Sequence, residues 1–184
     1  MLRRLFITAW VLCIAACVVR AEGDAAMKIT SRAFGPGQPI PVKYTGDGDD
    51  KSPPLALANV PSGAKTLALI VDDPDAPTPQ PWVHWVIFNI PAGAAGLPEA
   101  EPRKGKLIEP AGATQGVNSW PSDNLGYRGP APPRGHGVHH YHFKLYALDT
   151  SLNLDPGITK NDLLAAMKNH ILAEAELIGT YERP

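Results

Sequence analysis

The feature that most restricts the fold of this chain is the way proline and glycine divide its apolar sequence. Of the 184 residues, 20 are proline and 17 are glycine. Proline fixes φ and removes a backbone donor, so long helices are disfavoured. The apolar runs left between these residues are short, as is typical of β-strands, and they cover residues 40–44, 66–71, 82–90 and 142–148.

The runs differ in pattern, and the pattern indicates how each strand is buried. Residues 67–71 are apolar throughout, as expected of a strand buried on both faces. Residues 142–148 alternate between apolar and polar, as expected of a strand with one buried face. Alternation returns over 174–181, which predicts a last strand.

A single helix is predicted near the C-terminus. Thr159 is followed three residues later by Asp162, a spacing typical of a helix start, and apolar residues at 163, 164, 167 and 171 continue at helical spacing. The fold class expected is therefore mainly β, a β-sandwich of antiparallel sheets with long loops and a small C-terminal helix.

Residues 1–21 are typical of an export signal, with a short basic segment before an apolar run over 5–19. This run is shorter than the ~20 residues of a membrane-spanning helix, so we expect cleavage and no transmembrane span. Cleavage after Ala21 gives a free domain over 22–184. Cleavage before Cys17 gives a lipoprotein, with a lipid anchor that tethers the domain to a membrane. We predict an exported protein, periplasmic or secreted, with the anchor as the alternative.

Composition restricts the remaining possibilities. A net charge of −1 offers no basic surface of the kind that nucleic-acid binding requires. The hydrophobic content of 44% is enough for one core, so 22–184 is expected to be a single domain. Both cysteines, Cys13 and Cys17, lie in the signal segment, which leaves the domain without a disulfide.

Candidate functional residues first appear directly after the buried strand. Asp73 and Asp75 stand in a turn that Pro74 and Pro77 restrict in φ, as suits a pocket wall. A solvated surface turn is the alternative, because aspartate and proline favour turns.

A second candidate, His84, lies in an apolar strand between Trp82 and Trp85. A buried imidazole needs a hydrogen-bond partner. His84 is therefore either a pocket residue or a structural histidine bonded to a backbone carbonyl.

A third segment, the proline- and glycine-rich loop 127–137, leads into a strand rich in histidine. Alternation with period two places His139 and Tyr141 on one face of this strand and His140 and His142 on the other. Only His139 and Tyr141 can then share a pocket with the other candidates. A surface cluster of histidines is the alternative.

Taken in order, these motifs resemble the phosphatidylethanolamine-binding protein (PEBP) family, and most closely its bacterial Raf kinase inhibitor-like branch. The motifs are Asp-Pro-Asp-Ala-Pro (73–77), Trp-x-His (82–84), Gly-x-x-Pro-Pro (129–133) and Gly-x-His-x-Tyr (137–141). The resemblance extends from about residue 27 to 181, although segment 118–121 departs from the family's pattern. It implies a β-sandwich with a small pocket that binds phosphate-like groups, including phospholipid headgroups.

The resemblance also implies which residues bind the ligand. The expected ligand-binding residues are Asp73, His84, Gly129, Ala131, Pro132, Pro133, His139 and Tyr141, with Asp75, Pro77 and Trp82 as support. Protonated His84 and His139 are expected to donate to phosphate oxygens, joined by the Tyr141 hydroxyl and by N–H groups of Gly129 and Ala131. Asp73 either orients a histidine or accepts from the ammonium of a headgroup.

Two other functions stay open at this point. Some relatives inhibit proteases or regulate signalling, and the same aspartates and histidines could hold a metal in a phosphoester hydrolase. The sequence has no His-Glu-x-x-His, Gly-x-Ser-x-Gly or phosphate-loop motif, so we expect no enzyme, no metal and no cofactor. The expected partner is a small anionic ligand or a phospholipid headgroup, with no nucleic acid; a homodimer is left open.

Overall fold

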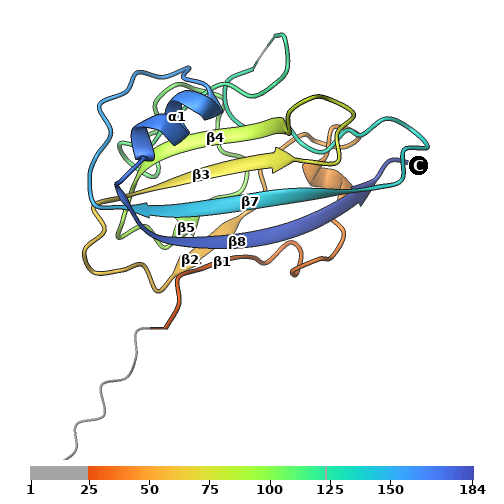
Figure 1. The fold of residues 1–184 in the computed structure, drawn as a ribbon. Coiled ribbons are helices and arrows are strands. Elements are labelled where there is room, and N and C mark those ends of the chain that lie inside the picture. Colours follow the sequence, from red (N-terminus) through yellow and green to blue (C-terminus); the bar gives the residue numbers. More distant parts are fainter. Residues whose placement is uncertain (1–24, 123) are drawn as a thin grey trace, which may run out of the picture.

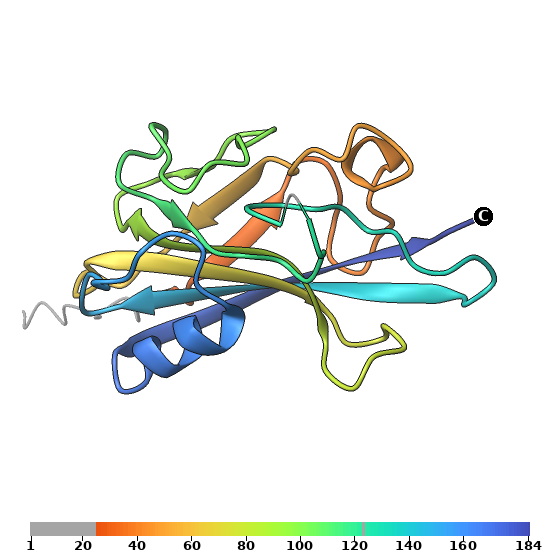
Figure 2. The same cartoon turned by 90° about the horizontal axis from the view of Figure 1, so that it is seen from above.

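The computed structural model describes residues 25–122 and 124–184, which form two β-sheets and a helix in three layers (Figures 1 and 2). The strands are β1 (Lys28–Ser31), β2 (Leu55–Ala58), β3 (Thr66–Asp73), β4 (Trp82–Pro91), β5 (Gly96–Leu97), β6 (Thr114–Gln115), β7 (Val138–Leu148) and β8 (Ile171–Glu182). A short 3-10 helix, η1 (Val42–Tyr44), and an α-helix, α1 (Lys160–Met167), complete the elements.

All strand pairs are antiparallel, and they form a sheet of order β1-β2-β5 and a sheet of order β6-β4-β3-β7-β8. Figure 2 shows the smaller sheet on one face of the larger sheet and α1 on the other. The predicted fold class, an antiparallel β-sandwich with a small late helix, is confirmed.

The larger sheet is the centre of the molecule, since both of its faces are covered. Leu67, Leu69 and Val71 of β3 pack toward the smaller sheet, and Ala68 and Ile70 pack in a second cluster toward α1. Every residue of β3 is buried, as the unbroken apolar run predicted.

The predicted strand over 40–44 is wrong. This segment begins with one isolated bridge, between Pro39 and Thr180, and then turns into η1. The backbone pairs with β8 only from Gly37 to Ile40, and the Tyr44 N–H then donates to the Pro41 carbonyl within η1. The sequence analysis also missed β1 and β2, and it extended the helix to Ile171, which instead begins β8.

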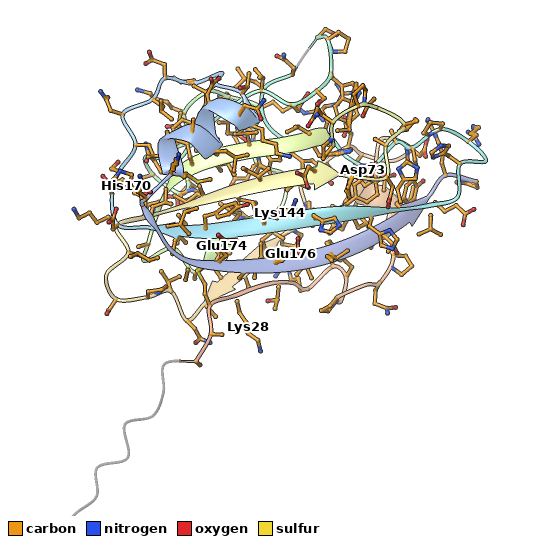
Figure 3. All side chains as sticks on the ribbon, in the orientation of Figure 1. Lys28, Asp73, Lys144, His170, Glu174 and Glu176 are labelled. Carbon is orange, nitrogen blue, oxygen red and sulfur yellow. The ribbon has the colours of Figure 1, made fainter. Side chains whose placement is uncertain are left out.

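The antiparallel order brings the functional segments to one end of the larger sheet. Asp73 at the end of β3 pairs with Trp82 at the start of β4, and His139 at the start of β7 pairs with Tyr181 near the end of β8. Figure 3 shows Asp73 at this end of the sheet. None of the helices in the described part of the chain is both long and apolar enough to cross a membrane. The predicted signal segment and Cys17 lie outside the described residues.

Candidate functional site

A cavity of about 400 Å³ opens at this end of the larger sheet, between the loops that follow β3 and precede β7. Its walls consist of Asp73, Ala76, Pro77, Thr78, Trp82, His84, Trp120, Ala131, Pro132, Pro133, His139 and Arg183. The structure therefore brings together the predicted site residues from three separate segments. Tyr141, Gly129 and Asp75 are the predicted residues that do not line it.

Asp73 and His139 form a buried pair at the base of the cavity. Their side chains are 4% and 1% exposed, and His139 Nδ1 lies 2.7 Å from Asp73 Oδ2. The other nitrogen, Nε2, lies 2.8 Å from Nδ1 of His136 in the loop before β7. Because the carboxylate accepts from Nδ1–H, only one proton lies between the two histidine rings. His136 is exposed, so this chain of groups runs from solvent to the buried carboxylate.

His84 combines the two roles that the sequence left open. Its Nδ1 lies 2.7 Å from the Arg128 carbonyl, so Nδ1–H donates to the backbone, and the side chain also lines the cavity. Burial lowers the pKa of His84 to about 4. This lowered pKa argues against the expected cationic His84 at neutral pH. The Nε2 atom of the neutral ring is a hydrogen-bond acceptor, and no described residue donates to it.

Tyr141 is buried and is not among the residues that line the cavity. The residue is 1% exposed, and its ring meets the His84 ring edge-on at 5.1 Å between centroids. Burial, followed by the Asp73 carboxylate, raises the pKa of Tyr141. Its hydroxyl has no hydrogen-bond partner in the described part of the chain. Tyr141 is thus placed to pack against the ring of His84.

The expected role of Gly129 as a ligand donor is wrong, because its N–H already donates to Asp50 Oδ1 at 2.6 Å. A side chain at this position would meet the Tyr44 carbonyl oxygen at 2.4 Å from the added Cβ, which explains the glycine. Gly129 therefore holds the wall loop against the body of the domain.

Asp75 also acts through the loop that carries it. Its N–H donates to Asp73 Oδ1 at 2.9 Å, and its own Oδ2 accepts from the His140 N–H at 2.8 Å. The turn after β3 is thereby tied to β7. Asp75 supports the cavity, as predicted, but its carboxylate does not line it.

Arg183, which no sequence motif predicted, is the one lysine or arginine among the residues that line the cavity. Its Nε and Nη2 lie 2.8 and 2.6 Å from Asp47 Oδ1. No local motif marks Arg183. Only the pairing of β8 with β7, with Tyr181 opposite His139, brings it to the site.

Trp120 was also missed as a wall residue, although its segment had been noted for departing from the family pattern. Its ring centroid lies 5.0 Å from that of His84, and the Arg128 guanidinium lies over it at 5.2 Å.

Within residues 25–122 and 124–184, no three His, Cys, Asp or Glu side chains are grouped so that they could hold a metal ion.

The sequence that forms this cavity matches a known protein family. A family model described as phosphatidylethanolamine-binding protein matches residues 30–182. The chain belongs to this family. A relative from Methanothermobacter thermautotrophicus, called UPF0098 protein, is 54% identical over 157 residues, which cover 85% of this chain and 99% of that protein.

Two solved structures of PEBP-family proteins resemble this fold. A PEBP homologue from Chlamydia trachomatis, CT736, is 42% identical with a TM-score of 0.76, over 86% of this chain and 99% of its own. YbcL of E. coli, described as a member of the mammalian PEBP family, is 34% identical with a TM-score of 0.78, over 87% of this chain and 100% of its own. The resemblance inferred from the motifs is confirmed, and family membership supports a binding function.

Proposed function

We propose that this PEBP-family chain is a non-catalytic binding protein whose cavity holds a small phosphate-type anion, free or as a phospholipid headgroup. One observation carries the proposal: Arg183 and His84 line the same cavity, and Nε2 of His84 has no hydrogen-bond partner among the described residues. A guanidinium donates to phosphate oxygens, and an imidazole can accept from a hydroxyl of inorganic phosphate or, once protonated, donate to a phosphodiester, which has no hydroxyl.

Arg183 supplies the permanent charge. Two of its nitrogens are engaged by a single oxygen of Asp47, which leaves Nη1 without a partner in the described part of the chain. A planar guanidinium can bond a carboxylate along one edge and a phosphate along another. The anion therefore adds to the existing ion pair and does not have to break it.

His84 adapts to the protonation state of the ligand. Its Nδ1–H is committed to the Arg128 carbonyl. Nε2 can accept the proton of a phosphate hydroxyl, or it can become protonated when a dianion enters, since a nearby negative charge favours the imidazolium. In both cases a complex formed from the phosphate dianion takes up one proton, so binding should weaken as pH rises through the second pKa of phosphate.

The hydrogen bonds of Asp73 favour one of its two expected roles. Oδ1 accepts from the Asp75 N–H, and Oδ2 is engaged by His139. With a partner on each oxygen, Asp73 is better suited to fix the ring of His139 than to accept from an ammonium group.

Titration calorimetry with inorganic phosphate and with phosphoethanolamine tests the proposal, between pH 5.5 and 8. We expect Arg183→Met to weaken phosphate binding at least tenfold, and His139→Ala to weaken it as well. Arg32→Met, at an exposed site away from the cavity, is the matched control. Wild-type affinity in both Arg183→Met and His139→Ala would disprove the site. Vesicles with and without phosphatidylethanolamine then separate a headgroup from a free anion.

A further inference from the structure

Strand β8 is an edge of the larger sheet, and part of that edge already pairs with an extended segment, residues 37–40. Gly37 N–H donates to the Ile178 carbonyl at 2.7 Å, Thr180 N–H donates to the Gln38 carbonyl at 3.0 Å, and Ile40 N–H donates to the Thr180 carbonyl at 2.7 Å. The bridge between Pro39 and Thr180 is parallel. The outer edge of β8 is therefore shaped to accept an extended chain, and even-numbered residues present their backbone groups to it.

The same edge continues beyond the segment that fills it. The β7–β8 register is unbroken from Glu182 to Ala173, so Glu174 and Glu176 also direct their N–H and C=O groups outward. Both residues are exposed, and no described residue bonds to these four groups. Unpaired groups of this kind are a template for a further strand.

The side chains beside this free edge are acidic. Glu176 and Glu174 stand opposite Lys144 and Tyr146 of β7, on the face that carries α1. Figures 1 and 3 show α1 over β3 and β4, with Glu174 and Glu176 on the uncovered margin. Glu176 pairs with His142, and Lys144 is engaged by Asp72. Glu174 forms no ion pair within the described part of the chain. A strand laid here would meet two carboxylates on this face.

The opposite face of the edge offers space of a different kind. A hollow of about 380 Å³ borders Ala173 and is lined by residues 25–27 and 59–62. Successive residues of an incoming strand point to opposite faces. One set of its side chains would lie over the glutamates, and the other set would face this hollow.

We propose that the β8 edge at residues 173–177 docks an extended segment of another protein, in which basic residues alternate with apolar ones. The segment adds to the sheet as a sixth strand, through backbone bonds to Glu174 and Glu176. A second copy of this chain fits less well, because antiparallel pairing of two β8 strands places glutamates opposite glutamates, and like charges in that position are destabilising.

A fluorescent nine-residue peptide of alternating lysine and valine tests the proposal by anisotropy with the purified protein. We expect saturable binding that weakens at least tenfold in Glu174→Lys/Glu176→Lys. Glu174→Pro removes an outward N–H without breaking a β7–β8 bond, so it should weaken binding as well. Glu182→Lys, at an exposed residue on the same strand, is the control.

Amide hydrogen exchange distinguishes strand addition from loose electrostatic attraction. The peptide should protect the Glu174 and Glu176 amides, while a glutamate–valine peptide should not. No peptide binding, or binding that Glu174→Pro leaves unchanged, would overturn the proposal. A concentration-dependent dimer that Glu174→Pro abolishes would replace the basic partner with a second copy. Phosphate binding in the cavity should be the same in all these variants.

Discussion

Asp72 and Asp73 are neighbours at the end of β3, both are buried, and their surroundings differ in a way that separates structure from function. Asp72 is 0% exposed, and its two oxygens meet Lys144 Nζ and Lys160 Nζ on the face that carries α1. Asp73 is 3% exposed and faces the cavity, where its partners are a histidine and a backbone N–H. Two lysines pair with Asp72, whereas the partner of Asp73 is a histidine that lines a ligand-sized space.

A third buried carboxyl, Glu101, extends this comparison because it has no cation. It is 7% exposed, Oε1 has no partner within the described residues, and burial followed by Glu109 raises its pKa to about 7. The three carboxyls thus face two ammonium groups, one imidazole and no cation. We expect the loss of stability on removing each charge to follow this series, whereas the loss of ligand binding should be confined to Asp73.

The largest expected effect is the loss of stability in Asp72→Asn. Removing this charge leaves two lysines, 34% and 20% exposed at the side chain, next to a buried amide that cannot neutralise them. We expect the free energy of unfolding to fall by about 2–4 kcal/mol. Asp73→Asn should cost about 1–2 kcal/mol, because asparagine still offers an oxygen to His139. Urea denaturation at pH 7 measures both, and a larger loss in Asp73→Asn would contradict the comparison.

The next effect concerns Glu101, whose pKa is higher in the folded than in the unfolded protein. The stabilising contribution of its protonated form is complete below about pH 4.5 and is lost as pH rises through about 7. Glu101→Gln should remove this dependence and raise the free energy of unfolding at pH 8 by on the order of 1–2 kcal/mol. Thermal unfolding of both proteins at pH 5 and pH 8 is the measurement. Equal slopes with pH would show that Glu101 is not the responsible group.

How much of this could be predicted from the sequence depends on whether the information is local. The unbroken apolar run of β3 and the alternation of His139 and Tyr141 gave the burial of these strands correctly, because period and polarity are local properties. Arg183 could not be found in this way, since it follows His139 by 44 residues and reaches the cavity only because β8 pairs with β7.

The errors at the site have a similar cause. The sequence shows that His84 has apolar neighbours. Its charge depends on which carbonyl it bonds to and how completely it is buried. The Gly129 N–H was expected to be free because the distant Asp50, which binds it, carries no motif of its own. Residue type and spacing predicted eight of the twelve residues that line the cavity, whereas the protonation and partners of these residues depend on tertiary contacts.

A third prediction compares binding instead of stability in the two aspartates. Asp73→Asn removes the carboxylate that fixes the His139 ring in the cavity wall, so phosphate affinity should fall about tenfold, or about 1.4 kcal/mol. The Asp72 side chain points to the other face of the sheet, so Asp72→Asn should change phosphate affinity less than twofold. Calorimetry at pH 6.5 on both folded variants gives the values. Equal losses of phosphate affinity would mean that Asp73 has no larger part in binding than Asp72.

The smallest expected effects are those of the single lysines that bond Asp72. Lys144→Met and Lys160→Met each leave the carboxylate with one ammonium group, so each should cost only about 0.5–1 kcal/mol. The double variant leaves Asp72 buried without a cation, and its cost should exceed the sum of the single costs by about 1 kcal/mol. Urea denaturation of the four proteins in the cycle measures this excess. Strict additivity would show that Asp72 does not depend on having two cations, and the contrast with the single imidazole of Asp73 would then lose its energetic basis.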